Sequence, residues 1–212
     1  GETDIIKEMQ TVDSYAIKDQ FDTLKNLSNG VYASKMVTHD IFNKTFSELD
    51  FDYNTYFPTI FHTEHDGKGG MTDNKGQLPV FNYKDNKMIS DKPEGTMNFV
   101  STTSKVQNEH EGPEGERIFP RALAQKLSFK SQVITLNARG FTGLSVGDLC
   151  SFEVPAYEPP GMDNPLGIDP YMSGRYIVRK IHHKISTVKD NHSMNLELIK
   201  DAVRVAYPEE NL

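Results

Sequence analysis

The sequence predicts a mainly β protein with short helices, an α+β chain of antiparallel strands joined by long loops. Apolar and polar residues alternate in several stretches after residue 130, which is typical of half-buried strands. Stretches with a helical spacing of apolar residues are short. The middle of the chain is rich in Gly, Asp, Asn, Lys and Glu, a composition that favours loops over a packed core.

The composition of the chain disfavours several classes of binding partner and of functional site. The 212 residues suit one large domain or two small ones. A formal net charge of -7 disfavours nucleic acid as a partner, because phosphate binding depends on Lys and Arg. No apolar run approaches the roughly 20 residues of a membrane-spanning helix, so we expect no membrane contact. Cys150 is the only cysteine, which excludes an internal disulfide and a cysteine-based zinc site.

Residues 1–62 predict a strand, a helix and a second strand. β-branched and aromatic side chains over 5–17 favour the first strand, although their alternation is imperfect. Loose alternation over 31–46 favours the second strand, with one side exposed to solvent. We expect this segment to pack with the C-terminal strands.

The helix expected between these strands rests on three apolar residues. Phe21, Leu24 and Leu27 recur at intervals of three, which places them on one side of a short helix. Asp19 is a candidate N-cap and Gly30 a candidate end. We expect the helix to dock by its apolar side.

We expect residues 63–116 to form a loop-rich insertion. Their polar and glycine-rich composition buries too little apolar surface to make a core. One short apolar segment, residues 77–83, favours a strand inside this insertion.

Residues 117–205 predict a short helix followed by the C-terminal strands, and residues 206–212 form a tail. Pro120 suits the first turn of the helix, where its missing N–H costs nothing. Alternation over 131–140 predicts a strand that ends at Gly140. A turn at residues 147–148, a strand ending at Pro155 and a surface loop over 156–174 follow.

Two further alternating stretches predict a β-hairpin. Residues 176–185 and 193–198 flank a polar turn, and each stretch has the period of two that strands require. A regular alternation places Ile177, Ile181 and Ile185 on one face.

Three histidines lie in this hairpin and could suggest a metal site. His182 and His183 are adjacent, so they point to opposite faces of a strand and cannot both reach one ion. His192 can approach only one of them. The hairpin therefore predicts no metal site of three histidines, and we expect His183 at the margin of the core with a hydrogen bond.

A second group of metal-ligating residue types lies at His62, Glu64, His65 and Asp66. It lacks the helical HExxH spacing of zinc hydrolases, and the glycines that follow favour a solvated loop. A metal-dependent hydrolase that uses these four residues stays the least favoured alternative. No G-x-S-x-G, P-loop or G-x-G-x-x-G motif is present. We expect no enzyme activity, no catalytic residue, no cofactor and no metal.

From Phe119 onward, the order of elements resembles a known family. Its matching stretches are RALAQKLSFKSQVITLNARG, the VGD turn before a strand, SGRYIVRKIHHKI and the closing NLELIKD. This order is similar to the C-terminal β-barrel of the baseplate hub proteins of contractile-tailed, T4-like bacteriophages. The upstream strand, helix and strand also have counterparts there, whereas the loop-rich middle does not.

The resemblance implies an antiparallel β-barrel and a structural role in the virion. Hub proteins of this family form trimeric rings that link the tail tube to the central spike, and they assemble in the host cytoplasm. It therefore implies a homotrimer that contacts tube, spike and other baseplate proteins. Because a complete hub is longer and this sequence starts at Gly1, we expect the later part of a longer chain. A carbohydrate-binding β-module that uses Tyr53, Tyr56 and Phe57 is the alternative.

Overall fold

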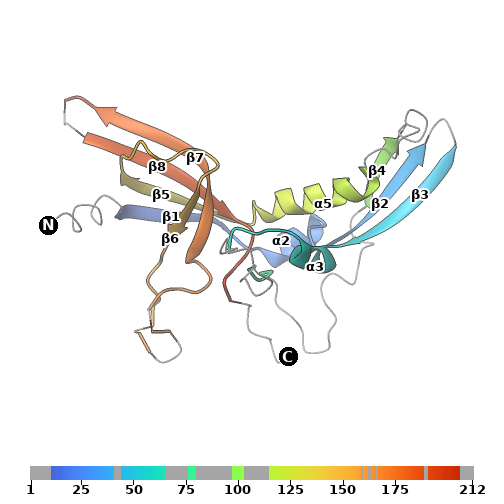
Figure 1. Ribbon diagram of the computed structural model, residues 1–212, viewed down its shortest axis with the longest axis horizontal. Coiled ribbons are helices and arrows are strands. Elements are labelled where there is room, and N and C mark those ends of the chain that lie inside the picture. Colours follow the sequence, from blue (N-terminus) through green and yellow to red (C-terminus); the bar gives the residue numbers. More distant parts are fainter. Residues whose placement is uncertain are drawn as a thin grey trace. The chain divides into compact units, whose positions relative to one another are not determined.

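The computed structural model describes the following residues: 11–40, 44–64, 76–79, 97–102, 115–158, 160–161, 164–165, 167–188 and 191–205. They divide into two compact units (Figure 1). The five-stranded unit comprises Gly1–Phe21, His62–Gln77 and Lys130–Val205, and the three-stranded unit comprises Asp22–Phe61, Leu78–Phe129 and Ala206–Leu212. This division cuts across the segments 1–62 and 117–205 that the sequence suggested.

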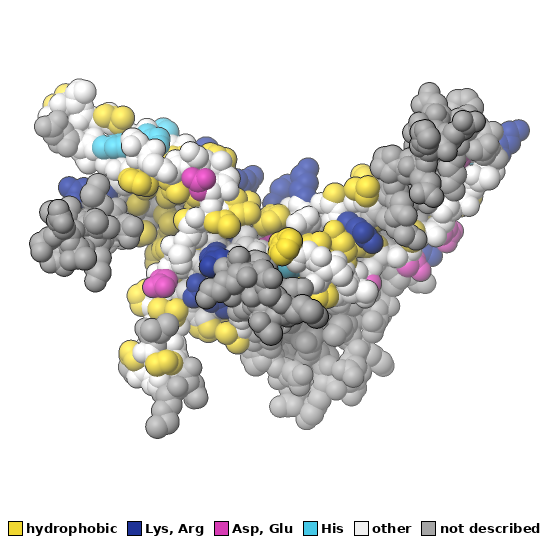
Figure 2. Space-filling model, in the orientation of Figure 1, with side chains coloured by type: hydrophobic (Ala, Val, Ile, Leu, Met, Phe, Trp, Pro, Cys, Tyr) yellow, Lys and Arg dark blue, Asp and Glu magenta, His cyan; other side chains and the backbone are white. Residues whose placement is uncertain are grey.

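The five-stranded unit is an antiparallel sheet with the strand order β1-β5-β8-β7-β6. Its strands are β1 (Val12–Gln20), β5 (Gln132–Arg139), β6 (Leu149–Phe152), β7 (Gly174–Ser186) and β8 (Asn191–Lys200). The sheet curls into a half-barrel, and hydrophobic side chains gather over it (Figures 1 and 2). The prediction of antiparallel β structure is confirmed. The barrel is not closed, because β1 and β6 each pair with one strand only in the described part of the chain.

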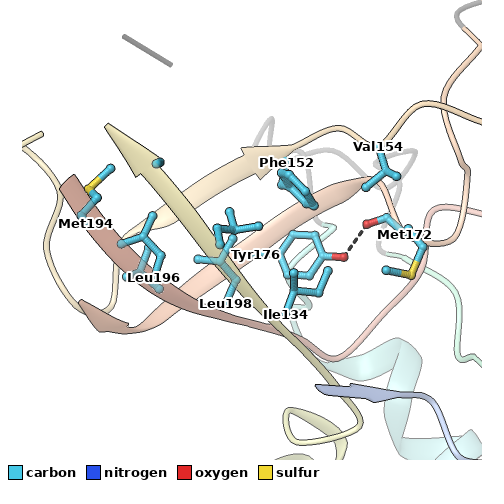
Figure 3. Close-up of a cluster of buried hydrophobic side chains, with 11 residues drawn as sticks. Ile134, Phe152, Val154, Met172, Tyr176, Met194, Leu196 and Leu198 are labelled. Carbon is cyan, nitrogen blue, oxygen red and sulfur yellow. Dashed lines mark hydrogen bonds between the residues drawn. The ribbon is translucent and has the colours of Figure 1, made fainter. Parts of the chain in front are cut away.

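One cluster of buried apolar side chains fills the curl of this sheet (Figure 3). Alternate residues of the three central strands point into it, as the period of two requires. Its members are Ile134, Leu136, Ala138, Phe152, Val154, Met172, Tyr176, Val178, Met194, Leu196 and Leu198. Ile134 and Leu136 both belong to the cluster, as the alternation predicted over 131–140 requires.

The β7–β8 hairpin is confirmed, but one of its faces was predicted wrongly. The register is interrupted between Val178 and Lys180, so β7 carries an extra residue opposite β8. Such a bulge shifts the alternation by one position. Ile177 consequently lies on the face opposite to Ile181, which packs against the core cluster. Ile185 is exposed near the turn.

The three-stranded unit has the strand order β3-β2-β4. Its strands are β2 (Ala33–Asp40), β3 (Thr45–Asp52) and β4 (Met97–Thr102). β2 pairs antiparallel with β3 and parallel with β4. The single strand predicted over 31–46 is therefore wrong, because β2 ends at Asp40 and the chain returns in β3. β4 lies inside the predicted insertion 63–116, which is not made of loops alone.

The described residues of the three-stranded unit also form four helical elements: α2 (Thr23–Ser28), α3 (Tyr53–Tyr56), the 3-10 helix η1 (Phe57–Thr59) and α5 (Gly115–Ser128). Asp22, not Asp19, caps α2, because its side chain accepts a hydrogen bond from the backbone N–H of Lys25. The predicted apolar docking face is wrong, since Leu24 is 78% exposed and Asn26 is the buried residue of α2.

Four other sequence predictions have different outcomes in the structure. Gly30 ends α2 with φ 69°, the left-handed conformation that glycine adopts without strain. Pro120 lies inside α5 and not in its first turn. The predicted first strand overlaps β1, but residues 1–10 lie outside the described residues. In the predicted strand 77–83, Gln77 forms an isolated bridge with Val203, and residues 80–83 lie outside the described part.

Candidate functional site

The candidate residues His62 and Glu64 lie at the end of β8 in the five-stranded unit. Both are buried, with exposed fractions of 6% and 5%. The predicted solvated loop is therefore wrong for this part of the segment. His65 and Asp66 lie outside the described residues, so the four-residue ligand set is not brought together in the described chain.

His62 pairs with an aspartate that directly follows β8. Its Nδ1 lies 2.8 Å from Oδ2 of Asp201, and both side chains are fully buried. The other carboxylate oxygen of Asp201 accepts hydrogen bonds of 3.0 Å from the backbone N–H and the hydroxyl of Thr63. Because a buried carboxylate is costly unless it is paired and hydrogen-bonded, these contacts fix segment 62–63 against the sheet.

Glu64 is held by groups from three residues, Arg175, Lys200 and Arg204. Its Oε1 accepts a hydrogen bond of 2.9 Å from the backbone N–H of Arg175, and its Oε2 accepts one of 3.1 Å from Nε of Arg204. Lys200 Nζ lies 3.9 Å from Oε1. A glycine is needed beside this carboxylate, because a Cβ on Gly174 would lie 1.8 Å from Oε1 and the φ of Gly174 is 149°.

Lys200 is a fully buried cation at the end of β8. Its Nζ donates to the carbonyl oxygens of Tyr171, at 2.5 Å, and Ser173, at 3.2 Å. It also lies 4.9 Å from the centroid of the Tyr176 ring. Burial lowers the pKa of Lys200 to about 8, an effect that the nearby Glu64 carboxylate only partly offsets.

Tyr176 joins this polar region to the apolar core. Its hydroxyl donates to the carbonyl oxygen of Met172, the contact drawn as a dashed line in Figure 3. Burial is the largest cause that raises the pKa of Tyr176, and the Glu64 carboxylate raises it further. The phenol therefore stays neutral and serves as a hydrogen-bond donor.

We call His62, Glu64, Lys200, Asp201 and Arg204 the ionic cluster. Each member contacts another member or a backbone group, and four of the five are buried. The cluster joins chain segments separated by more than one hundred residues, since His62 and Asp201 are 139 positions apart. Its contacts indicate a structural role, since they hold residues 62–64 against the end of β8. Among the described residues, no group of three or more His, Cys, Asp or Glu could hold a metal ion.

Sequence reasoning missed the C-terminal half of this cluster. Lys200 and Asp201 follow the alternating apolar residues of β8 and were included in the closing strand without a role. One feature of the sequence could have indicated their burial. The two charged residues at the end of this strand are followed directly by two apolar residues, Ala202 and Val203. All four residues are buried in the structure.

The hairpin histidines are arranged as their spacing predicts. His182 lies opposite Asn195, and His183 lies opposite Met194, so the two adjacent rings belong to different faces. His183 alone reaches His192, with its Nδ1 3.1 Å from Nε2 of His192. His183 has the expected hydrogen-bonding partner and lies on the core face opposite Met194, but its side chain is exposed.

The aromatic residues proposed for carbohydrate binding pack together in the three-stranded unit. Tyr53 is fully buried and Phe57 is 6% exposed. Their rings meet edge to face with centroids 5.7 Å apart. Tyr56 is partly exposed, but the guanidinium of Arg121 lies 4.7 Å from its ring centroid. These contacts are typical of core anchors, and they leave little ring face for a sugar.

Exposed apolar side chains lie on both edge strands of the half-barrel. Tyr15 and Ile17 of β1 are 47% and 46% exposed, and Leu149 of β6 is 59% exposed. Natural sheets rarely leave apolar edge strands open, because an open edge can pair with another chain. Tyr15 and Ile17 are opposite Leu136 and Ile134 and lie on the core face of the sheet, whereas Leu149 is opposite Ile177 and lies on the other face. We call these three exposed side chains of the two edge strands the edge surface.

Comparison of the chain with protein-family models and with curated protein sequences gives no match. In the described part of the chain, every helix is too short or too polar to span a bilayer.

Proposed function

We propose that this chain is a structural part of a phage tail baseplate hub, in a ring that links the tail tube to the central spike. The observation that carries the proposal is the edge surface on an incompletely closed antiparallel sheet. Apolar edge strands are covered when subunits associate, and closed rings are a common way to cover them. The resemblance of the C-terminal sequence to hub barrels supports the same role.

The contacts of the buried charged side chains favour a structural role over catalysis. The ionic cluster gathers most of the buried charged groups of the five-stranded unit, and these groups bind one another or the backbone. A hydrolase with His62 and Glu64 as ligands would need both side chains to leave these partners. A carbohydrate-binding module would need Tyr53 and Phe57 to be exposed. We therefore propose no enzyme activity.

The proposed partners follow from the hub assignment. They are two further copies of the chain in a homotrimer, the tail tube, the central spike and other baseplate proteins. The proposed location is the virion, after assembly in the host cytoplasm. The net charge of -7 supports a tube wall that does not retain the phosphates of passing DNA.

The mass of the protein in solution tests the proposal. We expect light scattering after size exclusion to give a mass that rises with concentration towards three times 24.0 kDa. Ile17→Asp and Leu149→Asp should return the mass to that of a monomer, because each places a charge in the edge surface. Val188→Asp is the matched control, since Val188 is exposed at 93% near the β7–β8 turn.

Two results would contradict the proposal. One is a strict monomer at the highest concentration, which would exclude self-association through this chain. The other is a trimer whose mass is unchanged in both edge variants. Circular dichroism of each variant should match the wild type, so that a lost trimer is not confused with a lost fold.

A further inference from the structure

We infer that His183 and His192 form a two-histidine site for a divalent transition-metal ion at the end of the β7–β8 hairpin. The ions of matching chemistry are Cu²⁺, Ni²⁺ and Zn²⁺, for which imidazole is a preferred ligand. This site differs from the three-histidine site that the sequence excludes, because His182 takes no part in it. It does not depend on the hub assignment.

The separation of the two nitrogens fits metal ligation. Nδ1 of His183 lies 3.1 Å from Nε2 of His192. Imidazole nitrogens bind these ions at about 2.0–2.1 Å, so two such bonds at a right angle set the nitrogens about 2.9 Å apart. At a tetrahedral angle the separation is about 3.3 Å. The observed value lies between the two, so the strands need not move for both nitrogens to bind.

Only the orientation of the rings has to change. The ring centroids lie 5.2 Å apart with an interplanar angle of 41°, so the two nitrogens face each other almost end to end. Rotations of the two side chains must turn each lone pair by about 40°, towards a point beside the line between the nitrogens. His183 is exposed and His192 is partly exposed, so the side-chain torsions and the ion are both accessible.

The strands hold the pair in place. His183 and His192 lie on adjacent antiparallel strands and on the same face, since His183 is opposite Met194 and His192 is opposite Ile185. Ligands on paired strands lose little conformational freedom when an ion binds, which favours binding.

Gly140, just after β5, is a positioning residue for this pair. Its backbone N–H donates to the carbonyl oxygen of His192 at 2.8 Å. The imidazole of His192 lies directly over Gly140, and a Cβ at this position would come within 2.1 Å of its Cγ. A side chain at residue 140 would therefore displace the ring while leaving both histidines in the sequence.

The ion would have two protein ligands, with water in its remaining positions. No third His, Cys, Asp or Glu joins the pair within the described chain. Among late first-row ions the expected order of affinity places Cu²⁺ above Ni²⁺ and Zn²⁺. Mg²⁺ prefers oxygen ligands and should not bind here.

The test is calorimetric titration of the full 212-residue chain with Cu²⁺, Ni²⁺ and Zn²⁺, and with Mg²⁺ as the negative probe. We expect one Cu²⁺ per chain. His183→Asn and His192→Asn should each weaken binding about tenfold or more, because each removes one of two linked ligands. His182→Asn is the matched control, an exposed histidine on the same strand but the opposite face, and its affinity should equal that of the wild type.

Gly140→Ala provides a second test that keeps all seven histidines. We expect a weaker affinity for Cu²⁺ than in the wild type, with an unchanged circular dichroism spectrum. The electron paramagnetic resonance spectrum of the wild-type Cu²⁺ adduct should show two nitrogen ligands.

Either of two outcomes overturns the inference. In the first, the His183→Asn and His192→Asn double variant still binds one Cu²⁺ as tightly as the wild type. In the second, His182→Asn loses as much affinity as His183→Asn while both variants stay folded. Each would assign the binding to another group.

Discussion

Tyr15 of β1 and Phe152 of β6 meet edge to face, with ring centroids 5.8 Å apart, although their strands form the two opposite edges of one sheet. Phe152 in turn contacts Tyr176, at 6.1 Å. The half-barrel is therefore bridged by aromatic side chains at the place where a closed barrel would have backbone hydrogen bonds. In the described part of the chain, side-chain packing joins the two edges of the sheet that strand pairing does not join.

A double-mutant cycle at Tyr15 and Phe152 measures this bridge. Phe152→Ala should lower the free energy of unfolding by about 3 kcal/mol or more, because Phe152 is only 8% exposed. Tyr15 is half exposed, and Tyr15→Ala should cost about 1 kcal/mol. Urea unfolding of the two single variants and the double variant should give a coupling of about 1 kcal/mol. Additive effects would mean that the rings touch without stabilising the curl.

Leu196 tests the inward face of β8. Leu196→Asp should abolish cooperative unfolding or lower stability by several kcal/mol, because it buries an unpaired carboxylate at a position only 5% exposed. Asn195→Asp is the matched control, since Asn195 is the exposed neighbour on the other face and should change stability by less than about 1 kcal/mol. Thermal melting compares the two. Equal melting temperatures for both variants would contradict the inward placement of Leu196.

Gly174 tests the packing of Glu64. Gly174→Ala should cost about 3 kcal/mol or more, because it combines a strained φ of 149° with a Cβ placed against the Glu64 carboxylate. Gly147→Ala separates these two causes, since Gly147 also has a positive φ, 99°, but its Cβ would meet nothing within 4 Å. This control should cost about 1–2 kcal/mol in denaturant unfolding. A Gly174 variant no less stable than the Gly147 variant would show that Glu64 moves freely.

Lys200 gives the protein a predictable dependence on pH. Its pKa is lowered from 10.5 to about 8 by folding, so the unfolded chain binds more protons than the native chain between these values. Stability should therefore rise with pH from about 8, as the buried ammonium loses its charge. Between pH 7.5 and pH 9, the wild type should gain on the order of 1 kcal/mol relative to Lys200→Met.

The comparison with Lys200→Met is needed because Cys150 acts in the opposite direction. Burial raises the pKa of its thiol from 9.0 to about 11, so this group lowers stability as the pH rises above 9. Cys150 is present in both proteins and cancels in their difference. Parallel plots of unfolding free energy against pH for the two proteins would refute the burial of a charged Lys200.

Local patterns predicted those parts of the fold that local interactions determine. The alternation identified β5 as a strand, and it identified both strands of the β7–β8 hairpin, their pairing and most of their faces. It failed at Ile177, because the bulge between Val178 and Lys180 adds one residue and no periodic pattern marks its position. It failed also at Leu24, whose helical spacing suggested burial although α2 is only six residues long and exposes that side.

The ionic cluster could not be predicted, because its members meet only through the tertiary fold. The polar sequence around His62 and Glu64 is by itself typical of a solvated loop. Its burial depends on Asp201 and Arg204, which lie 139 and 140 positions further along the chain. β4 escaped prediction for a related reason, since its parallel partner β2 is separated from it by a long connection.

The segments of the two units alternate along the chain, and this order has a consequence for protein synthesis. β1 leaves the ribosome well before its partner strand β5, because Asn137 follows Ser14 by 123 positions. At about 5–20 residues per second, β1 waits roughly 6–25 s for this partner. The three-stranded unit lies between them in sequence and can fold during that interval. During this interval the nascent chain carries β1, with the exposed side chains of Tyr15 and Ile17, without its native neighbour β5.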